Sequence, residues 1–355
     1  MELPQVAMAP GEQSLEHCFG CGKANPIGLK LRPVYDGEKV VVRFTPREQH
    51  QGWYNVTHGG IIFSILDEIT AYSVLCTGYY FGVTAKSSIR FKHVSPTDAT
   101  LVASAWVTKA TARLVETRGR LELEDGTVVA EVEATFFPGK GSPRAFLWDL
   151  DGVIIDSAAP HYQSWRNALA AHGTSLTRKQ FRSYFGTRND HIIREVLGPL
   201  PESEVKAISE EKEQRYRDLI RGKTRAFPGA MELLRVMKKG NYPVALATSA
   251  PPENVELVSA QLGLSAYFDV VVCGQDVKES KPSPDIFLRA AEKLGVDPGQ
   301  CVVFEDSPHG VAAAKRGGMK CVAVTNSHPA EALQAADRVA SSLEQVDLIE
   351  LIRFI

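Results

Sequence analysis

Beyond residue 144, short apolar segments alternate with amphipathic helical stretches, and this alternation constrains the possible folds more than any other feature of the sequence. Strands and helices in alternation are typical of a parallel β-sheet covered by helices. The region from 144 to 355 is therefore expected to form an α/β domain. Its predicted strands are Ala145–Leu150, Pro243–Thr248, Val270–Cys273, Cys301–Phe304 and Lys320–Val324.

Between Ser157 and Phe227 no strand pattern is visible, and the sequence instead predicts helices. An inserted helical segment of this size indicates a cap over one end of the sheet, at about residues 158–226. Phe227-Pro-Gly229 marks the return to the sheet. The predicted cap helices are His161–His172, Arg178–Tyr184, Asp190–Leu197 and Glu202–Ile220.

The first 137 residues have a different pattern, in which most segments alternate as strands do. One helix, from about Gly59 to Leu75, is apolar on almost every side, so we expect an antiparallel sheet to wrap around it. A Pro/Gly/Ser-rich linker at 138–143 separates the two patterns. The sequence therefore predicts two domains, an α+β domain at 1–137 and the α/β domain at 144–355, a number that fits a chain of 355 residues.

Composition narrows the possible partners. Lys and Arg (40) nearly balance Asp and Glu (42), without a basic stripe, so we expect no nucleic-acid binding. The apolar runs are shorter than the ~18 residues that span a bilayer, and the first residues lack a signal-peptide pattern, so we expect a cytoplasmic protein without membrane contact. Cys18-Phe-Gly-Cys21 has no second Cys/His pair at a familiar spacing, and we expect it to form a turn rather than a metal site.

Polar residues follow several predicted strands of the α/β domain. Asp149-Leu-Asp151-Gly comes at the end of the first strand, Thr248-Ser249 follows the second, and Glu305-Asp306 follows the fourth. Lys281 lies in a Ser-Lys-Pro segment between them. Because ligands collect at the carboxyl ends of parallel strands, we expect these side chains to form one site.

The residue types suit phosphoryl transfer. A carboxylate that attacks a phosphate ester is repelled by its negative charge, so a divalent cation and fixed donors must neutralise that charge. Asp149, Glu305 and Asp306 offer the oxygen ligands that Mg²⁺ prefers, while Lys281 and Thr248 offer donors. The sequence thus predicts a magnesium-dependent phosphatase that acts on a small phosphorylated substrate.

From about residue 144 onward the sequence resembles the haloacid dehalogenase-like phosphatases with a helical cap, in the branch that includes β-phosphoglucomutase. The resemblance implies a Rossmann-like sheet in which Asp149 forms a phospho-aspartate. Asp151 would protonate the leaving group, later activate water, and offer its backbone carbonyl to the metal. Thr248 and Lys281 would hold the phosphoryl oxygens, with Ser249 beside them, and Glu305 and Asp306 would complete the metal shell.

Details of the motifs favour hydrolysis over the mutase reaction, which remains the alternative. Asp151 is present, as in phosphatases but not dehalogenases, and Ser249-Ala-Pro-Pro-Glu-Asn254 lacks the lysine expected in the mutase. In the cap, His161 is a mutase-like feature that would contact substrate or only pack between helices. Arg188, in a segment similar to the cap's substrate loop, would hold a second anionic group or face solvent.

In the first domain, Thr57-His58-Gly59-Gly60 opens the apolar helix and Asp67 follows further along it. Backbone N–H groups at a helix start can stabilise an oxyanion, and a carboxylate amid apolar neighbours must serve some purpose or face water at a seam between subunits. The alternative is that His58 only caps the helix and Asp67 is simply polar.

Residues 16 to 137 resemble the hotdog-fold acyl-CoA thioesterases of the phenylacetate-pathway type. The resemblance implies that the backbone at Gly60 polarises the thioester carbonyl, that Asp67 acts as base or nucleophile, and that His58 orients the turn or the substrate. It also implies a homo-oligomer formed through the hotdog domain. The whole chain is expected to be a bifunctional hydrolase, unless the hotdog half only binds acyl-CoA or dimerises the phosphatase.

Overall fold

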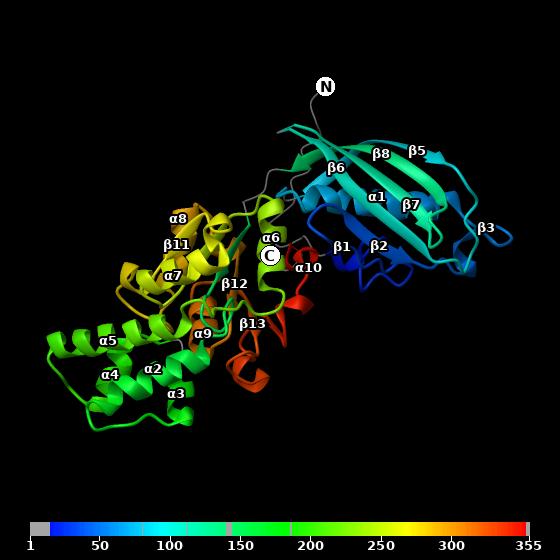
Figure 1. Ribbon diagram of the computed structural model, residues 1–355. Helices are drawn as coiled ribbons and strands as arrows, with labels where there is room; N and C mark the ends of the chain where they lie inside the picture. The colour runs from blue at the N-terminus through cyan, green and yellow to red at the C-terminus, as the bar shows by residue number, and fades with distance from the viewer. Residues whose placement is uncertain (1–14, 80, 112, 140–143, 185–186, 353–355) are drawn as a thin grey trace. The chain divides into compact units, whose positions relative to one another are not determined.

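The computed structural model describes residues 15–79, 81–111, 113–139, 144–184 and 187–352, and the chain divides into two compact units, Met1–Gly141 and Ser142–Ile355 (Figure 1). Within the described residues, no helix is long and apolar enough to cross a membrane.

The first unit is an antiparallel sheet wrapped around helix α1 (Gly59–Leu75), which is the hotdog arrangement. The strand order is β1-β2-β6-β7-β8-β5, and a small hairpin of β3 (Gln51–Trp53) and β4 (Val56–Thr57) stands apart from it. The strands of the main sheet are β1 (Val34–Tyr35), β2 (Val40–Phe44), β5 (Phe81–Phe91), β6 (Leu101–Ala110), β7 (Val115–Leu123) and β8 (Val128–Gly139).

Helix α1 lies in the position that its sequence predicts. Its buried residues include Ile62, Ile65, Leu66 and Ile69, and the helix contacts β2, β5, β6, β7 and β8. Burying each such side chain contributes roughly 1.5–3 kcal/mol, so the apolar helix and the curved sheet stabilise each other.

The second unit contains a parallel six-stranded sheet in the order β11-β10-β9-β12-β13-β14. Counted along the chain this is the doubly wound order 3-2-1-4-5-6, so the Rossmann-like prediction is confirmed. The strands are β9 (Ala145–Trp148), β10 (Val244–Ala247), β11 (Val270–Val272), β12 (Cys301–Glu305), β13 (Lys320–Val324) and β14 (Arg338–Ala340).

Helices between the strands complete this unit. Leu147, Val303 and Phe287 belong to one buried cluster, in which α8 and α9 pack on the sheet. The helices are α6 (Ala230–Lys239), α7 (Pro252–Leu262), α8 (Asp285–Leu294), α9 (Pro308–Arg316) and the C-terminal α10 (Leu348–Ile352).

Within the described residues, four helices inserted after β9 form the cap, around a separate apolar cluster that includes Trp165, Phe181 and Ile193. Helices α2 and α5 make the most extensive contact within it. The cap helices are α2 (Ala158–Ala170), α3 (Arg178–Tyr184), α4 (Asn189–Leu197) and α5 (Glu202–Ile220).

Two local features differ from the predicted pattern. Strand β8 continues through Pro138 and Gly139, which pair with β5, so the start of the expected linker is strand; residues 140–143 lie outside the described part. Strand β14 was not predicted, because its Arg-Val-Ala sequence is too short for alternation to show.

Candidate active sites

The predicted phosphoryl-transfer residues converge at the carboxyl ends of the parallel strands. Asp149 directly follows β9, Thr248 follows β10, and Glu305 is the last residue of β12. β9 and β12 are adjacent and lie where the strand order reverses, which is where doubly wound sheets bind ligands. The fold therefore brings residues from distant parts of the chain to one place.

Lys281 bridges the two buried carboxylates at this place. Its Nζ donates to Asp149 Oδ1 at 2.8 Å and to Glu305 Oε1 at 2.6 Å. Burial raises the pKa of Asp149 to about 7 against the charge of Lys281, with Glu305 adding to the rise. Burial would lower the pKa of Lys281, but the two carboxylates hold it above its usual value. Lys281 thus stays charged among the groups that would meet a phosphate.

Asp149, Glu305 and Asp306 form a cluster whose ligand atoms lie within 4.8 Å of one another. Glu305 Oε2 accepts from the backbone N–H of Asp306 and from Ser307, whereas Asp306 Oδ2 is buried with no hydrogen-bond partner among the described residues. Gly152 approaches Asp306 so closely that a Cβ there would collide with its carboxylate. A buried, unpartnered carboxylate oxygen in an oxygen-rich cluster fits a hard divalent cation.

Asp151 turns its carboxylate toward the cap rather than toward this cluster. Its Oδ1 lies 3.2 Å from His161 Nε2 and accepts from Tyr216 Oη at 3.3 Å. Burial would raise the pKa of Asp151, but His161 holds it below its usual value. In this arrangement Asp151 is a carboxylate ready to accept a proton.

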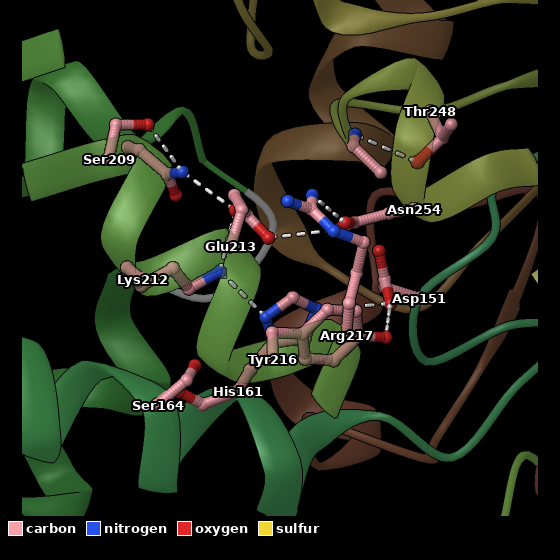
Figure 2. Close-up of polar contacts among 12 residues, drawn as sticks. Asp151, His161, Ser164, Ser209, Lys212, Glu213, Tyr216, Arg217, Thr248 and Asn254 are labelled. Carbon is pink, nitrogen blue, oxygen red and sulfur yellow. Dashed lines mark hydrogen bonds and ion pairs between the residues drawn. The ribbon is translucent and has the colours of Figure 1, made fainter. Parts of the chain in front are cut away.

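Behind His161 a chain of buried polar groups continues through α5, as Figure 2 shows. Lys212 Nζ lies 2.8 Å from His161 Nδ1 and donates to Glu213 Oε1 at 2.7 Å. Glu213 also accepts from Asn189 and Asn254, each at 2.7 Å. Burial would raise the pKa of Glu213, but the Lys212 charge lowers it to about 2.

A pocket between the cap and the sheet is lined by Asp149, Asp151, His161, Thr248 and Ser249, among others. Its volume is about 50 Å³. Thr248 Oγ1 accepts from the backbone N–H of Ala250 at 3.1 Å, which leaves the hydroxyl proton for another acceptor.

Arg188 does not line this pocket. Its guanidinium contacts Asp190 Oδ1 at 3.2 Å and the backbone oxygen of Lys278 at 3.4 Å, and it borders a separate depression along α5. The structure therefore gives Arg188 a local partner and does not join it to the cluster around Asp149.

Sequence reasoning missed Lys212 and Glu213, although one signal was present. The buried residues Val205, Ile208, Tyr216 and Ile220 are spaced as the apolar face of a helix, and Lys212 occupies that face. A lysine at an apolar position indicates a buried charge with a partner. The many Glu, Lys and Arg residues around Lys212 make this signal hard to recognise in the sequence.

In the first unit, His58 caps α1. Its Nδ1 accepts from the backbone N–H of Gly60 at 2.9 Å, so the donor expected to face a thioester already has a partner. Asp67 is half-buried, and its Oδ1 accepts from Thr84 Oγ1 at 2.9 Å. Gly60 and Asp67 are seven positions apart in the helix, which places them on one face about 10 Å apart. Within one chain these residues do not converge on one carbonyl.

Family models match both units. A haloacid dehalogenase-like hydrolase model matches residues 143–318, and a thioesterase superfamily model matches residues 54–130.

Two curated relatives match about half of the chain. Validoxylamine A 7'-phosphate phosphatase from Streptomyces hygroscopicus subsp. limoneus is 33% identical over 57% of this chain and 95% of the relative. The chloroplastic 5-amino-6-(5-phospho-D-ribitylamino)uracil phosphatase of Arabidopsis thaliana is 32% identical over 58% of this chain. The match covers 56% of the length of that relative.

Among solved structures, β-phosphoglucomutase from Clostridium difficile superposes with a TM-score of 0.55 and 30% identity, covering 59% of this chain and 97% of the mutase. This chain is a hydrolase that belongs to the haloacid dehalogenase-like family, with a thioesterase-superfamily hotdog domain preceding that region.

Proposed function

We propose that the second unit hydrolyses small phosphate esters with Mg²⁺ and a phosphorylated Asp149 as intermediate. The observation that carries this proposal is the buried convergence of Asp149, Lys281, Glu305 and Asp306 at the switch point of the sheet. The phosphatase names of the curated relatives support the reaction class.

The residues divide the reaction into two steps. A carboxylate oxygen of Asp149 attacks phosphorus, and the bond to the ester oxygen breaks. Asp151 takes up a proton while the cap is open and His161 is away from it, and gives that proton to the leaving alcohol after closure. Ionised Asp151 then takes a proton from water, which attacks the phospho-aspartate and releases phosphate. Lys281 and the Thr248 hydroxyl hold the phosphoryl oxygens, with Ser249 beside them.

The donor set fits Mg²⁺. Asp149 and Asp306 would hold it with the backbone carbonyl of Asp151, and Glu305 would complete the shell while positioning Lys281. When bound, Mg²⁺ supplies positive charge beside the transferred phosphoryl group.

The cap must move for a substrate to enter. A pocket of about 50 Å³ is far smaller than the roughly 300–1,000 Å³ of small-molecule sites. Opening would separate His161, on α2, from Asp151, and closure would restore their contact. Closure thus couples enclosure of the substrate to the protonation state of Asp151, the acid/base group.

For the first unit, we propose hydrolysis of acyl-CoA thioesters. Gly60 would polarise the carbonyl once a substrate oxygen competes with His58 for its N–H, and Asp67 would act as base or nucleophile. The thioesterase-superfamily match supports this assignment.

A screen of the full-length chain tests both reactions. Phosphate release from sugar and other small phosphate esters should require Mg²⁺, and acyl-CoAs should yield free thiol. With β-glucose 1-phosphate, free phosphate indicates hydrolysis, whereas glucose 6-phosphate would indicate a mutase. Acyl-CoA binding without thiol release would reduce the hotdog half to a binding module.

A further inference from the structure

A turn at the start of the first unit brings two thiols against a carboxylate from α1. The ligand atoms of Cys18, Cys21 and Glu68 all lie within 4.8 Å of one another. Cys18 Sγ is 3.5 Å from Glu68 Oε1 and 3.4 Å from Oε2, across a separation of fifty residues in sequence. The sequence alone shows only the pair of cysteines, because the third group, the carboxylate of Glu68, comes from a helix that is distant in the sequence.

The turn is held in place by backbone contacts. Gly22 N donates to Cys18 O at 2.9 Å, and Leu31 N donates to Gly20 O at 2.9 Å. Arg32 Nη1 donates to the carbonyl of Cys21 at 2.8 Å. A Cβ at Gly20 would collide with the Glu68 carboxylate, so the close approach requires glycine. These hydrogen bonds and the close approach at Gly20 fix the positions of Cys18, Cys21 and Glu68 relative to one another.

The burial and the ligand types of this cluster favour the binding of a cation. Cys21 is fully buried, while Cys18 and Glu68 are half-buried, and a carboxylate placed beside thiols away from water is costly without compensating charge. Two sulfurs and one carboxylate are ligands of a borderline-soft metal such as zinc rather than of Mg²⁺. Tyr72 Oη donates to Cys21 Sγ at 3.1 Å, as an outer-shell partner does for a metal ligand.

We propose that Cys18, Cys21 and Glu68 bind one Zn²⁺ ion, with water or a ligand in the fourth position. This site is separate from the magnesium cluster, since all three ligands belong to the hotdog unit. The ion would tie the turn at Cys18–Cys21 to the middle of α1, beside Asp67.

Metal analysis of the full-length chain, purified under reducing conditions, tests the proposal. The wild type should carry about one zinc per chain, which Cys18→Ser and Cys21→Ser should lose. Cobalt added to the zinc-free chain should give thiolate-to-metal charge-transfer absorption. Cys76→Ser, a buried cysteine of the same unit, is the matched control and should keep both the zinc and the absorption band.

Two further variants protect the test against misfolding. Glu68→Gln keeps both thiols and should weaken zinc binding, while Tyr72→Phe should lower the affinity by about tenfold. Circular dichroism and cooperative thermal unfolding like those of the wild type show that each variant still folds. The proposal is overturned if the reduced wild type binds neither zinc nor cobalt, if the cysteine variants keep the metal, or if the cysteines prove to be a disulfide that excludes it.

Discussion

At the scale of single residues, Asp149 stands out because its carboxylate is buried, shares Lys281 with Glu305 and faces the pocket. We predict that Asp149→Asn lowers phosphatase turnover at least about 1,000-fold, since an amide is a poor nucleophile. Acyl-CoA hydrolysis should be unchanged, because it takes place in a separate unit. Phosphate release and free-thiol release, measured on the same preparation, check both expectations.

EDTA should mimic this variant, and added Mg²⁺ should restore turnover. Near-normal phosphate release from Asp149→Asn would show that another group is the nucleophile. Loss of both activities would mean that the substitution damaged the whole chain.

Glu213 is a second informative residue, because it accepts hydrogen bonds from Lys212, Asn189 and Asn254 inside the cap. Glu213→Gln would leave the Lys212 ammonium without its carboxylate and turn an NH₂ group toward another donor. Removing one partner of a buried pair costs about 3–5 kcal/mol. We predict a loss of that size in the free energy of unfolding, followed by urea denaturation.

The control is Glu211→Gln on the same helix, whose exposed pair with Arg215 should contribute less than about 1 kcal/mol. The pKa of Glu213 is about 2 in the folded chain against an ordinary 4.5. Its stabilisation is therefore fully present above pH 4.5 and lost as the pH falls toward 2. Equal losses for both variants at neutral pH would contradict a special role for the buried pair.

At the scale of elements, the sequence predicts the long helices well and a polar strand poorly. α5 follows its amphipathic pattern from Glu202 to Ile220. The sequence of β7 (Val115–Leu123) shows no clear strand alternation, because its buried positions include Thr117 and Gly119 rather than a row of apolar residues. Contacts between residues far apart in the sequence cannot be predicted from local pattern. Examples are Lys212 beside His161 and Cys21 beside Glu68. The phosphatase motif residues can be predicted, because they directly follow recognisable strands.

Gly119 explains how β7 fits against α1. A Cβ at this position would lie 2.9 Å from Val132 Cγ1 and 3.2 Å from Thr70 Cγ2, so the helix packs on a strand that has no side chain there. We predict that Gly119→Ala destabilises the first unit by about 1–3 kcal/mol through overpacking. Gly59→Ala in the same unit, whose Cβ would meet only the Phe91 ring at an ordinary van der Waals distance of 3.4 Å, is the control. Thermal unfolding that shifts equally for both variants would refute this account.

At the scale of the whole molecule, the first unit has surfaces that suit a second copy. β5 ends the order of the main sheet, and its outer edge has no strand partner among the described residues. Trp53, Tyr54 and Phe91 are exposed apolar side chains. Phe91 is the last residue of β5, and a Cβ added at Gly59, the first residue of α1, would lie 3.4 Å from its ring. Exposed apolar side chains beside an open strand edge indicate a site of association.

We therefore predict a dimer or larger assembly formed through the hotdog unit. A chain that ends at Gly139, the last residue of β8, should remain oligomeric in light scattering, whereas one that begins at Ser142 should be monomeric and keep phosphatase activity.

The thioester site should be shared between two chains, because Gly60 and Asp67 of one chain are about 10 Å apart along α1 and can both reach one carbonyl only if each comes from a different copy. Asp67→Ala and Gly60→Pro chains should each be inactive toward acyl-CoA. When the two are unfolded together and refolded as a mixture, hybrid dimers contain one intact pair, and some thiol release should return. Refolding either variant alone is the control. A monomeric hotdog unit with full thioesterase activity, or a mixture as inactive as its components, would contradict the shared site.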